Sequence, residues 1–218
     1  MKNLEILYED ETCLAVNKPA GLPVQGGKNA PVSVDALLRT AFPGGLRPLL
    51  VHRLDKDTSG VLLTAKGGRN AAFYSALIAS RAVKKRYTAV CSGAAGVYLK
   101  NEGVITFAVD VHGKQKAART HYTITKRGET ETGVPFLVFE LELGTGRTHQ
   151  IRIHLQKSGA PILGDGKYGD FRLNKELRKT PGLRRMLLHA NALIFTTKNG
   201  AALEIKAPQP PEFQPWTS

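Results

Sequence analysis

Blocks of apolar residues separated by polar turns predict short β-strands in the first part of the chain. Leu4 to Tyr8 and Cys13 to Asn17 are two such blocks, and the acidic segment 9–12 joins them as a turn. Gly60 to Ala65 is a compact apolar block of strand length. The segment 18–23, LysProAlaGlyLeuPro, has the composition of a loop.

Further blocks of the same kind predict strands in the rest of the chain. They lie at Lys84 to Cys91, Thr120 to Lys126, Phe136 to Leu143, Leu187 to Thr196 and Ala201 to Lys206. The last two flank LysAsnGly at 198–200 and predict a hairpin. The proline-rich segment 208–211 is expected to be a surface terminus.

Two segments have helical patterns. Ser33 precedes apolar positions that continue to Ala41, so it is expected to cap a short helix that ends at Pro43 and the following glycines. Asn70 to Ala79 predicts a second helix. Many short strands with a few helices indicate one mixed α+β domain over residues 1–218.

The segment 146–159 has an ambiguous pattern. Its apolar residues Ile151, Ile153 and Leu155 alternate with period two, which is typical of a strand. We nevertheless predict a helix, because Thr148 can cap it, Lys157 suits its last turn and Gly159 can stop it.

The composition is that of a basic globular protein. The chain has 218 residues, of which 42% are hydrophobic, and its 31 Lys and Arg against 18 Asp and Glu give a net charge of +13. This excess favours a polyanionic partner such as nucleic acid. Cys13 and Cys91 form no disulfide or zinc pattern, which favours a reducing cytoplasm. No apolar run approaches the ~20 residues that span a membrane.

Candidate chemistry is concentrated at 52–60, in the sequence HRLDKDTSG between two apolar segments. A calcium loop is excluded here, because the position that requires a glutamate holds Lys66. Asp55 needs a partner if it is buried. Taken alone, it could be a structural carboxylate that binds Arg53 or neighbouring hydroxyls.

A second polar cluster contains Arg147, His149 and Arg152. A dinucleotide-binding loop is not favoured, because His149 occupies the position of the third glycine. A metal site is not favoured either, because His149 and His154 are not spaced to lie on one helical face. Tyr87 follows three basic residues and could stack on a base or pack within a strand. Two such clusters in one basic chain favour a functional role for Asp55.

The ordered motifs of this chain resemble those of RluA-type RNA pseudouridine synthases. They are HRLDKDTSG at 52–60, KKRYTAV at 84–90, TGRTHQIRIHL at 145–155, PILGDGKYG at 161–169 and LLHANALIF at 187–195. The resemblance covers about Leu4 to Lys206, and no accessory N-terminal RNA-binding domain is expected. It implies a mixed, largely antiparallel sheet with helices and loops around a central basic cleft.

The resemblance also implies roles for individual residues. Asp55 corresponds to the catalytic carboxylate, Arg152 to the arginine that pairs with it, and Tyr87 to the tyrosine against the target base. Arg53 corresponds to the residue that displaces the target base from its stack. His52, Arg147 and His149 are assigned to RNA binding together with Arg53.

The implied reaction isomerises a uridine of ribosomal or transfer RNA to pseudouridine without metal or cofactor. The carboxylate could add to the sugar or to the base, or deprotonate the sugar, and the sequence leaves these routes open. Further contacts to the RNA backbone are expected from Lys114, Lys116, Arg119 and the basic segment 172–185. A monomer is implied. The alternative is a non-catalytic RNA-binding protein that keeps the fold.

Overall fold

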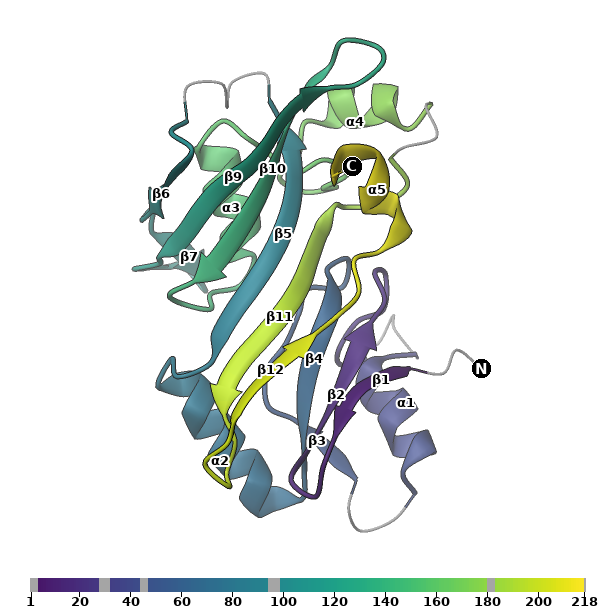
Figure 1. The fold of residues 1–218 in the computed structure, drawn as a ribbon, viewed down its shortest axis with the longest axis vertical. Helices are drawn as coiled ribbons and strands as arrows, with labels where there is room; N and C mark the ends of the chain where they lie inside the picture. The colour runs from purple at the N-terminus through teal and green to yellow at the C-terminus, as the bar shows by residue number, and fades with distance from the viewer. Residues whose placement is uncertain (1–3, 28–31, 44–46, 94–98, 180–182, 218) are drawn as a thin grey trace. The chain divides into compact units, whose positions relative to one another are not determined.

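The computed structural model describes residues 4–27, 32–43, 47–93, 99–179 and 183–217 (Figure 1). The chain forms two compact units. The first comprises Met1–Lys85 and Ala190–Pro208, and the second comprises Arg86–His189 and Gln209–Ser218. The glycines predicted to end the first helix, Gly44 and Gly45, lie outside the described residues. One catalytic domain without an accessory domain stays a prediction.

Most strand pairs of the first unit are antiparallel. Its main strands run in the order β1 (Glu5–Glu9), β2 (Cys13–Lys18), β4 (Ser59–Lys66) and β11 (Leu188–Thr196), while β3 (Pro48–Leu50) pairs with β4 and β12 (Ala202–Lys206) with β11. Residues 13–16 of β2 are apolar and buried, and the strand pairs with β4 from Cys13↔Ala65 to Lys18↔Gly60. The predicted strands and the C-terminal hairpin of this unit are therefore confirmed.

Two helices complete the first unit. Helix α2 (Gly68–Ala79) contributes Tyr74, which is fully buried against Cys13, Leu63 and Phe195 among other core residues. Helix α1 (Val34–Ala41) buries Val34 and Leu38, which lie one turn apart.

Ser33 is the N-cap of α1, as the sequence predicts. Its hydroxyl accepts a hydrogen bond from the Ala36 amide at 3.2 Å, and the residue is 1% exposed. Ser33→Ala is expected to lower the free energy of unfolding by about 1 kcal/mol, because a helix amide loses its acceptor. Urea denaturation measures this loss, and the exposed Ser80→Ala serves as the control. Equal stability of the Ser33 variant and the unsubstituted protein would contradict the cap assignment.

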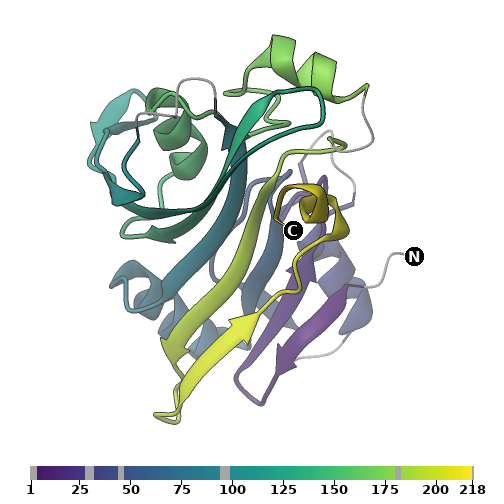
Figure 2. The same ribbon diagram turned by 45° about the horizontal axis from the view of Figure 1, so that its top comes forward.

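The second unit contains a further set of antiparallel strands. β5 (Lys84–Ser92), β10 (Pro135–Leu143), β9 (Thr120–Glu129) and β6 (Glu102–Ile105) are neighbours in that order, and β7 (Val109–Val111) pairs with β8 (Lys114–Lys116) in a separate hairpin. Figure 2 shows helix α3 (Gln150–Lys157) of this unit beside β9 and β10. The predicted helix at 146–159 is therefore confirmed.

The end of the chain packs into the second unit. Most of 208–211 is exposed, as predicted, but the 3-10 turn Pro211–Phe213 and helix α5 (Gln214–Thr217) follow it. Phe213 and Trp216 are buried, and the Trp216 ring meets the Phe136 ring at 5.2 Å between centroids. The terminus is thus part of a core, beside helix α4 (Phe171–Leu177).

The architecture confirms the predicted fold class, an α+β fold with a largely antiparallel sheet. The sequence did not predict β3, β6, β7, β8 or α4. The central basic cleft stays a prediction. Of the helices in the described ranges, none is long and apolar enough to cross a membrane.

Candidate active site

In the first unit, the segment that carries Asp55 connects β3 to β4. Leu54 is 7% exposed, Arg53 is exposed and Asp55 is half-buried. This confirms Leu54 as the buried residue between the two charged ones. The Thr58 amide donates to the Asp55 carbonyl at 3.2 Å and closes the turn. Gly60 follows at φ +114°, where an added Cβ would collide with the Ala190 carbonyl, so this position requires glycine.

Lys18 binds the turn that carries Asp55, a role that the sequence did not indicate. Its ammonium is completely buried and donates to three backbone carbonyls, those of Pro19 at 2.8 Å, Leu22 at 2.7 Å and Lys56 at 2.8 Å. The Gly21 amide also donates to the Lys56 carbonyl, at 2.9 Å. The loop after β2 and the turn that carries Asp55 are therefore held together by a charge-assisted contact.

His52 has a structural contact in this segment. Its Nε2 accepts a hydrogen bond from the Leu63 amide at 2.9 Å, which ties the segment to β4. Burial, and then the positive charge of Lys85, lower the pKa of His52 to about 3. The imidazole is therefore neutral at pH 7.

Lowering the pH is expected to destabilise the protein through His52. The unfolded imidazole takes up a proton near its ordinary pKa of 6.5, while the folded one stays neutral down to about 3. The stability contribution is complete above pH 6.5 and declines towards pH 3, by up to about 1.4 kcal/mol per pH unit. Urea denaturation from pH 7 to pH 5 tests this, with a weaker pH dependence expected for His52→Gln than for His121→Gln, a change at an exposed histidine. Equal pH dependence of both variants would exclude His52 as the source.

In the second unit, α3 begins differently from the prediction. The N-cap is His149, at φ 55° and without a side-chain cap, rather than Thr148. The reason is Gln150, which is 2% exposed and accepts hydrogen bonds from the Thr145 hydroxyl at 2.7 Å and the Arg147 amide at 3.1 Å. Gln150 also donates to the Arg119 carbonyl at 2.9 Å. This buried amide group thus fixes the loop that Thr148 was expected to cap.

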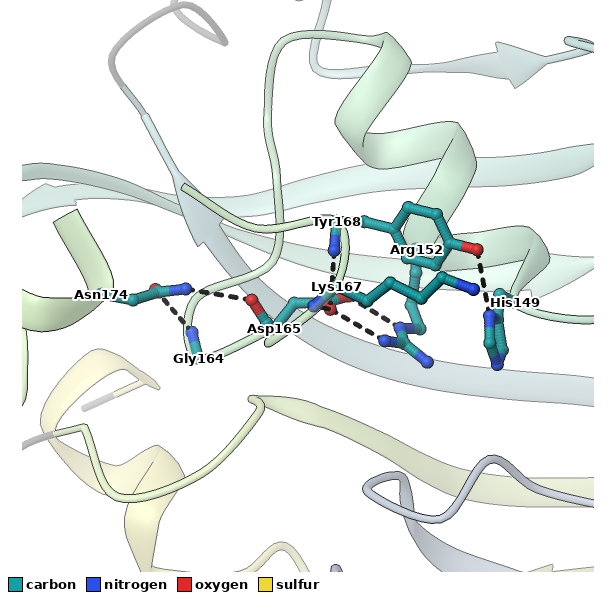
Figure 3. A network of polar contacts seen from close by, with 7 residues as sticks. All are labelled: His149, Arg152, Gly164, Asp165, Lys167, Tyr168 and Asn174. Carbon is teal, nitrogen blue, oxygen red and sulfur yellow. Dashed lines mark hydrogen bonds and ion pairs between the residues drawn. The ribbon is translucent and has the colours of Figure 1, made fainter. Parts of the chain in front are cut away.

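Arg152 is held by Asp165, a carboxylate that the sequence analysis did not assign to the site (Figure 3). Arg152 Nε donates to Asp165 Oδ2 at 2.7 Å and Nη2 donates to Oδ1 at 2.8 Å, which makes a bidentate pair. Arg152 is 7% exposed and Asp165 is fully buried. Burial acts to raise the pKa of Asp165, but hydrogen bonds from Arg152 and from the amides of Tyr168 and Lys167 outweigh it and hold the pKa below its usual range.

The loop 164–169 surrounds this pair. The Lys167 and Tyr168 amides donate to Asp165 Oδ1 at 2.8 and 3.0 Å. Asn174, from α4, donates to the Asp165 carbonyl at 3.1 Å and accepts from the Gly164 amide at 2.8 Å (Figure 3). Its glycine-rich sequence is typical of a loop, but only the fold shows that it supports Arg152.

Tyr168 brings two of the predicted residues together. Its hydroxyl lies 3.1 Å from His149 Nδ1, and the Arg152 Cζ lies 5.1 Å from its ring centroid (Figure 3). Lys167 Nζ lies at the same distance from this ring. Arg147, the third member of the predicted cluster, has an exposed side chain. His149 and Arg152 therefore share one network, whereas Arg147 faces solvent.

Tyr87 lies on β5, opposite Leu141 of β10, and is 7% exposed. The position of Tyr87 on a strand agrees with the sequence prediction. A role for Tyr87 against a base stays a prediction. Among the described residues, no group of three or more His, Cys, Asp or Glu side chains could hold a metal ion. The absence of a metal or cofactor from the reaction likewise stays a prediction.

Comparison with known proteins identifies the family. The family model for RNA pseudouridylate synthase matches residues 12–157. The ribosomal large subunit pseudouridine synthase C of Pasteurella multocida is 38% identical over 96% of this chain and 66% of its own length. The uncharacterized RNA pseudouridine synthase YlyB of Bacillus subtilis is 34% identical, over 95% of this chain and 70% of its own.

Solved structures agree. Human RNA Pseudouridylate Synthase Domain Containing 1 has a TM-score of 0.77 at 27% identity, and the match covers 96% of this chain and 84% of that one. Human RNA Pseudouridylate Synthase Domain Containing 4 has a TM-score of 0.75 at 27% identity, over 97% and 90%. The chain belongs to the RNA pseudouridylate synthase family. The predicted family is confirmed, and these relatives are named as synthases of pseudouridine in RNA.

Proposed function

We propose that this protein isomerises uridine to pseudouridine in RNA, and that ribosomal RNA of the large subunit is its substrate. The observation that carries this proposal is the family match over residues 12–157, which includes Asp55, Tyr87 and Arg152. The names of the bacterial relatives support the choice of ribosomal RNA. Because the chain spans about two thirds of the length of these relatives, their activity is proposed for it and not transferred directly.

Asp55 is the proposed catalytic carboxylate. The reaction breaks the bond between N1 and C1′ of the uridine, turns the uracil and joins C5 to C1′, after which the C5 proton is lost. A carboxylate can begin this sequence as a nucleophile or as a base. Asp55 is suited to meet a substrate, because its turn is fixed by Lys18 while its side chain is only half-buried.

Arg152 and Tyr87 are the other proposed catalytic residues. Arg152 is the arginine that the sequence assigns to the catalytic carboxylate, and the bidentate contact with Asp165 gives its guanidinium a fixed orientation. Tyr87 is buried on β5, which is paired with β10, and this suits a rigid surface against a base; its hydroxyl is a candidate for proton transfer at C5.

The remaining predicted residues are proposed to serve RNA binding in different ways. The exposed guanidiniums of Arg53 and Arg147 are available to bases and phosphates. His149 contributes through its contact with Tyr168. His52 is neutral and bonded to the backbone, so its contribution is to the shape of the segment. A monomer in the cytoplasm completes the proposal, and the two free, buried cysteines agree with a reducing compartment.

Unmodified transcripts test the proposed function. The protein is incubated separately with large-subunit ribosomal RNA, small-subunit ribosomal RNA and a transfer RNA pool, and pseudouridines are mapped by carbodiimide adducts that stop reverse transcriptase. New stops in the large-subunit RNA are expected. Stops confined to transfer RNA would overturn the choice of substrate, whereas RNA binding without any stop would favour the non-catalytic alternative.

A further inference from the structure

Phe107 is an aromatic side chain that the fold leaves in solvent. It lies between the edge strand β6 and the β7–β8 hairpin and is 45% exposed. Val104 on β6 is 46% exposed. The residues proposed for the reaction include neither Phe107 nor Val104. An exposed aromatic ring on a basic protein is a candidate binding surface.

The position of Phe107 is fixed by α3, the helix that carries Arg152. His154 Nε2 lies 2.8 Å from the Phe107 carbonyl oxygen, and Lys157 Nζ donates to the carbonyl of Ala108 at 3.4 Å. His154 is fully buried, and burial lowers its pKa, so a neutral imidazole donates this bond through Nε2. Its ring also meets the Phe107 ring edge-on, at 6.4 Å and 80°. The exposed ring is therefore preorganised, which reduces the entropy lost on binding.

Positive charges border the ring. Lys157 Nζ lies 5.7 Å from its centroid. The register of the hairpin places Lys116 opposite Val109, two residues from Phe107, and Lys114 opposite Val111. All three residues of β8 are exposed. The acidic residue of the hairpin, Asp110, accepts a hydrogen bond from the Gly113 amide in its turn at 3.0 Å.

We propose that Phe107 and its neighbours Lys116 and Lys157 form a binding surface for an unpaired nucleotide of the RNA substrate. The ring stacks on the base, while the two ammonium groups contact the adjoining phosphates. Stacking on aromatic residues tolerates any base, because every base has a π-face, so this surface adds affinity for single-stranded RNA and not base specificity. The proposal rests on the proposed function for the identity of the RNA.

Phe171 provides a matched comparison. It is also aromatic, belongs to the same unit and is 62% exposed at the start of α4. The cation–π contacts of the described residues involve Phe107 but not Phe171. Substitution of Phe171 therefore measures the effect of removing an exposed ring that lacks the surrounding arrangement.

The test measures RNA affinity and the rate of reaction separately. Binding of a fluorescein-labelled, unmodified large-subunit RNA transcript is measured for Phe107→Leu, Phe107→Trp, Phe171→Leu and the unsubstituted protein, after thermal unfolding has shown that each variant folds. Phe107→Leu is expected to weaken binding about tenfold, Phe107→Trp to retain it, and Phe171→Leu to leave it unchanged. Lys116→Gln and Lys157→Gln are each expected to reduce, by about 1, the magnitude of the slope of log K against the logarithm of the salt concentration. The enzyme concentration that gives half the maximal single-turnover rate should rise by the same factor for Phe107→Leu.

Several outcomes would overturn this assignment. Unchanged RNA affinity of Phe107→Leu would indicate that this surface serves a protein partner instead of RNA. Equal losses of RNA affinity for Phe107→Leu and Phe171→Leu would show a general effect of exposed rings. Failure of the unsubstituted protein to bind RNA would also overturn it. If the protein binds RNA with the predicted dependence on Phe107 but forms no pseudouridine, the proposed function fails and the binding surface stands.

Discussion

Replacing Asp55 with asparagine is expected to abolish pseudouridine formation while RNA affinity stays within about threefold of the unsubstituted protein. The amide has nearly the shape of the carboxylate but can act neither as the nucleophile nor as the base. The turn should persist, because its closing bond uses the Asp55 carbonyl of the backbone. A loss of at least about 10³-fold in the single-turnover rate is expected.

Asp57→Asn is the matched control for this experiment. Asp57 lies in the same turn and carries the same charge, but it is exposed. Its substitution removes one negative charge from the segment and should change the rate by less than about threefold. Equal rates for the Asp55 variant and the Asp57 variant would show that the wrong carboxylate has been assigned.

Replacing Asp165 with asparagine is expected to be the most destabilising single change considered. It removes the anion from a buried pair and leaves the Arg152 guanidinium, 7% exposed, without its bidentate partner. Breaking such a pair from one side costs about 3–5 kcal/mol of folding free energy. Because the folded pKa of Asp165 lies below its ordinary value of 3.8, its contribution is complete above that pH and declines as the pH falls further.

Urea denaturation of three variants tests this account of Asp165. Asp170→Asn removes a charge only five residues away, at the exposed N-cap of α4, and should cost no more than about 1 kcal/mol. The double variant Arg152→Met with Asp165→Leu removes both charges and should be more stable than Asp165→Asn. An Asp165 variant as stable as the Asp170 variant would show that the pair does not carry the predicted energy.

Local sequence patterns predicted the elements whose structure depends mainly on their own residues. Ser33 precedes an apolar stripe, and it caps α1. Apart from the three-residue β3, the strands of the first unit have apolar blocks long enough to be recognised, and β11 and β12 are joined at the glycine turn that the sequence indicates. The polar segment 52–60 was also found from sequence, because charged residues between apolar runs are unusual.

Other features depend on contacts between distant residues. Lys18 resembles any lysine at the end of a strand until the fold brings the Lys56 carbonyl to its ammonium. Asp165 resembles a loop residue until α3 presents Arg152 to it. β8, with the sequence LysGlnLys, has no apolar alternation, and its pairing with β7 determines its structure.

The last core residues were missed for a related reason. The prolines at 208–211 correctly indicate an exposed segment, but Phe213 and Trp216 follow within a few residues and pack against Phe136 and Leu187 of the second unit. A proline-rich composition describes the local backbone and carries no information on what a later aromatic side chain contacts.

Release of tritium from C5 of uridine is the most direct measurement of the central claim, that this protein converts uridine to pseudouridine. Large-subunit ribosomal RNA is transcribed with uridine tritiated at C5, because C5 loses that hydrogen to water after it bonds to C1′. We predict time-dependent release by the unsubstituted protein, equal in amount to the pseudouridine formed, and none by Asp55→Asn. No release above a heat-inactivated sample, from RNA that the protein demonstrably binds, would contradict the claim.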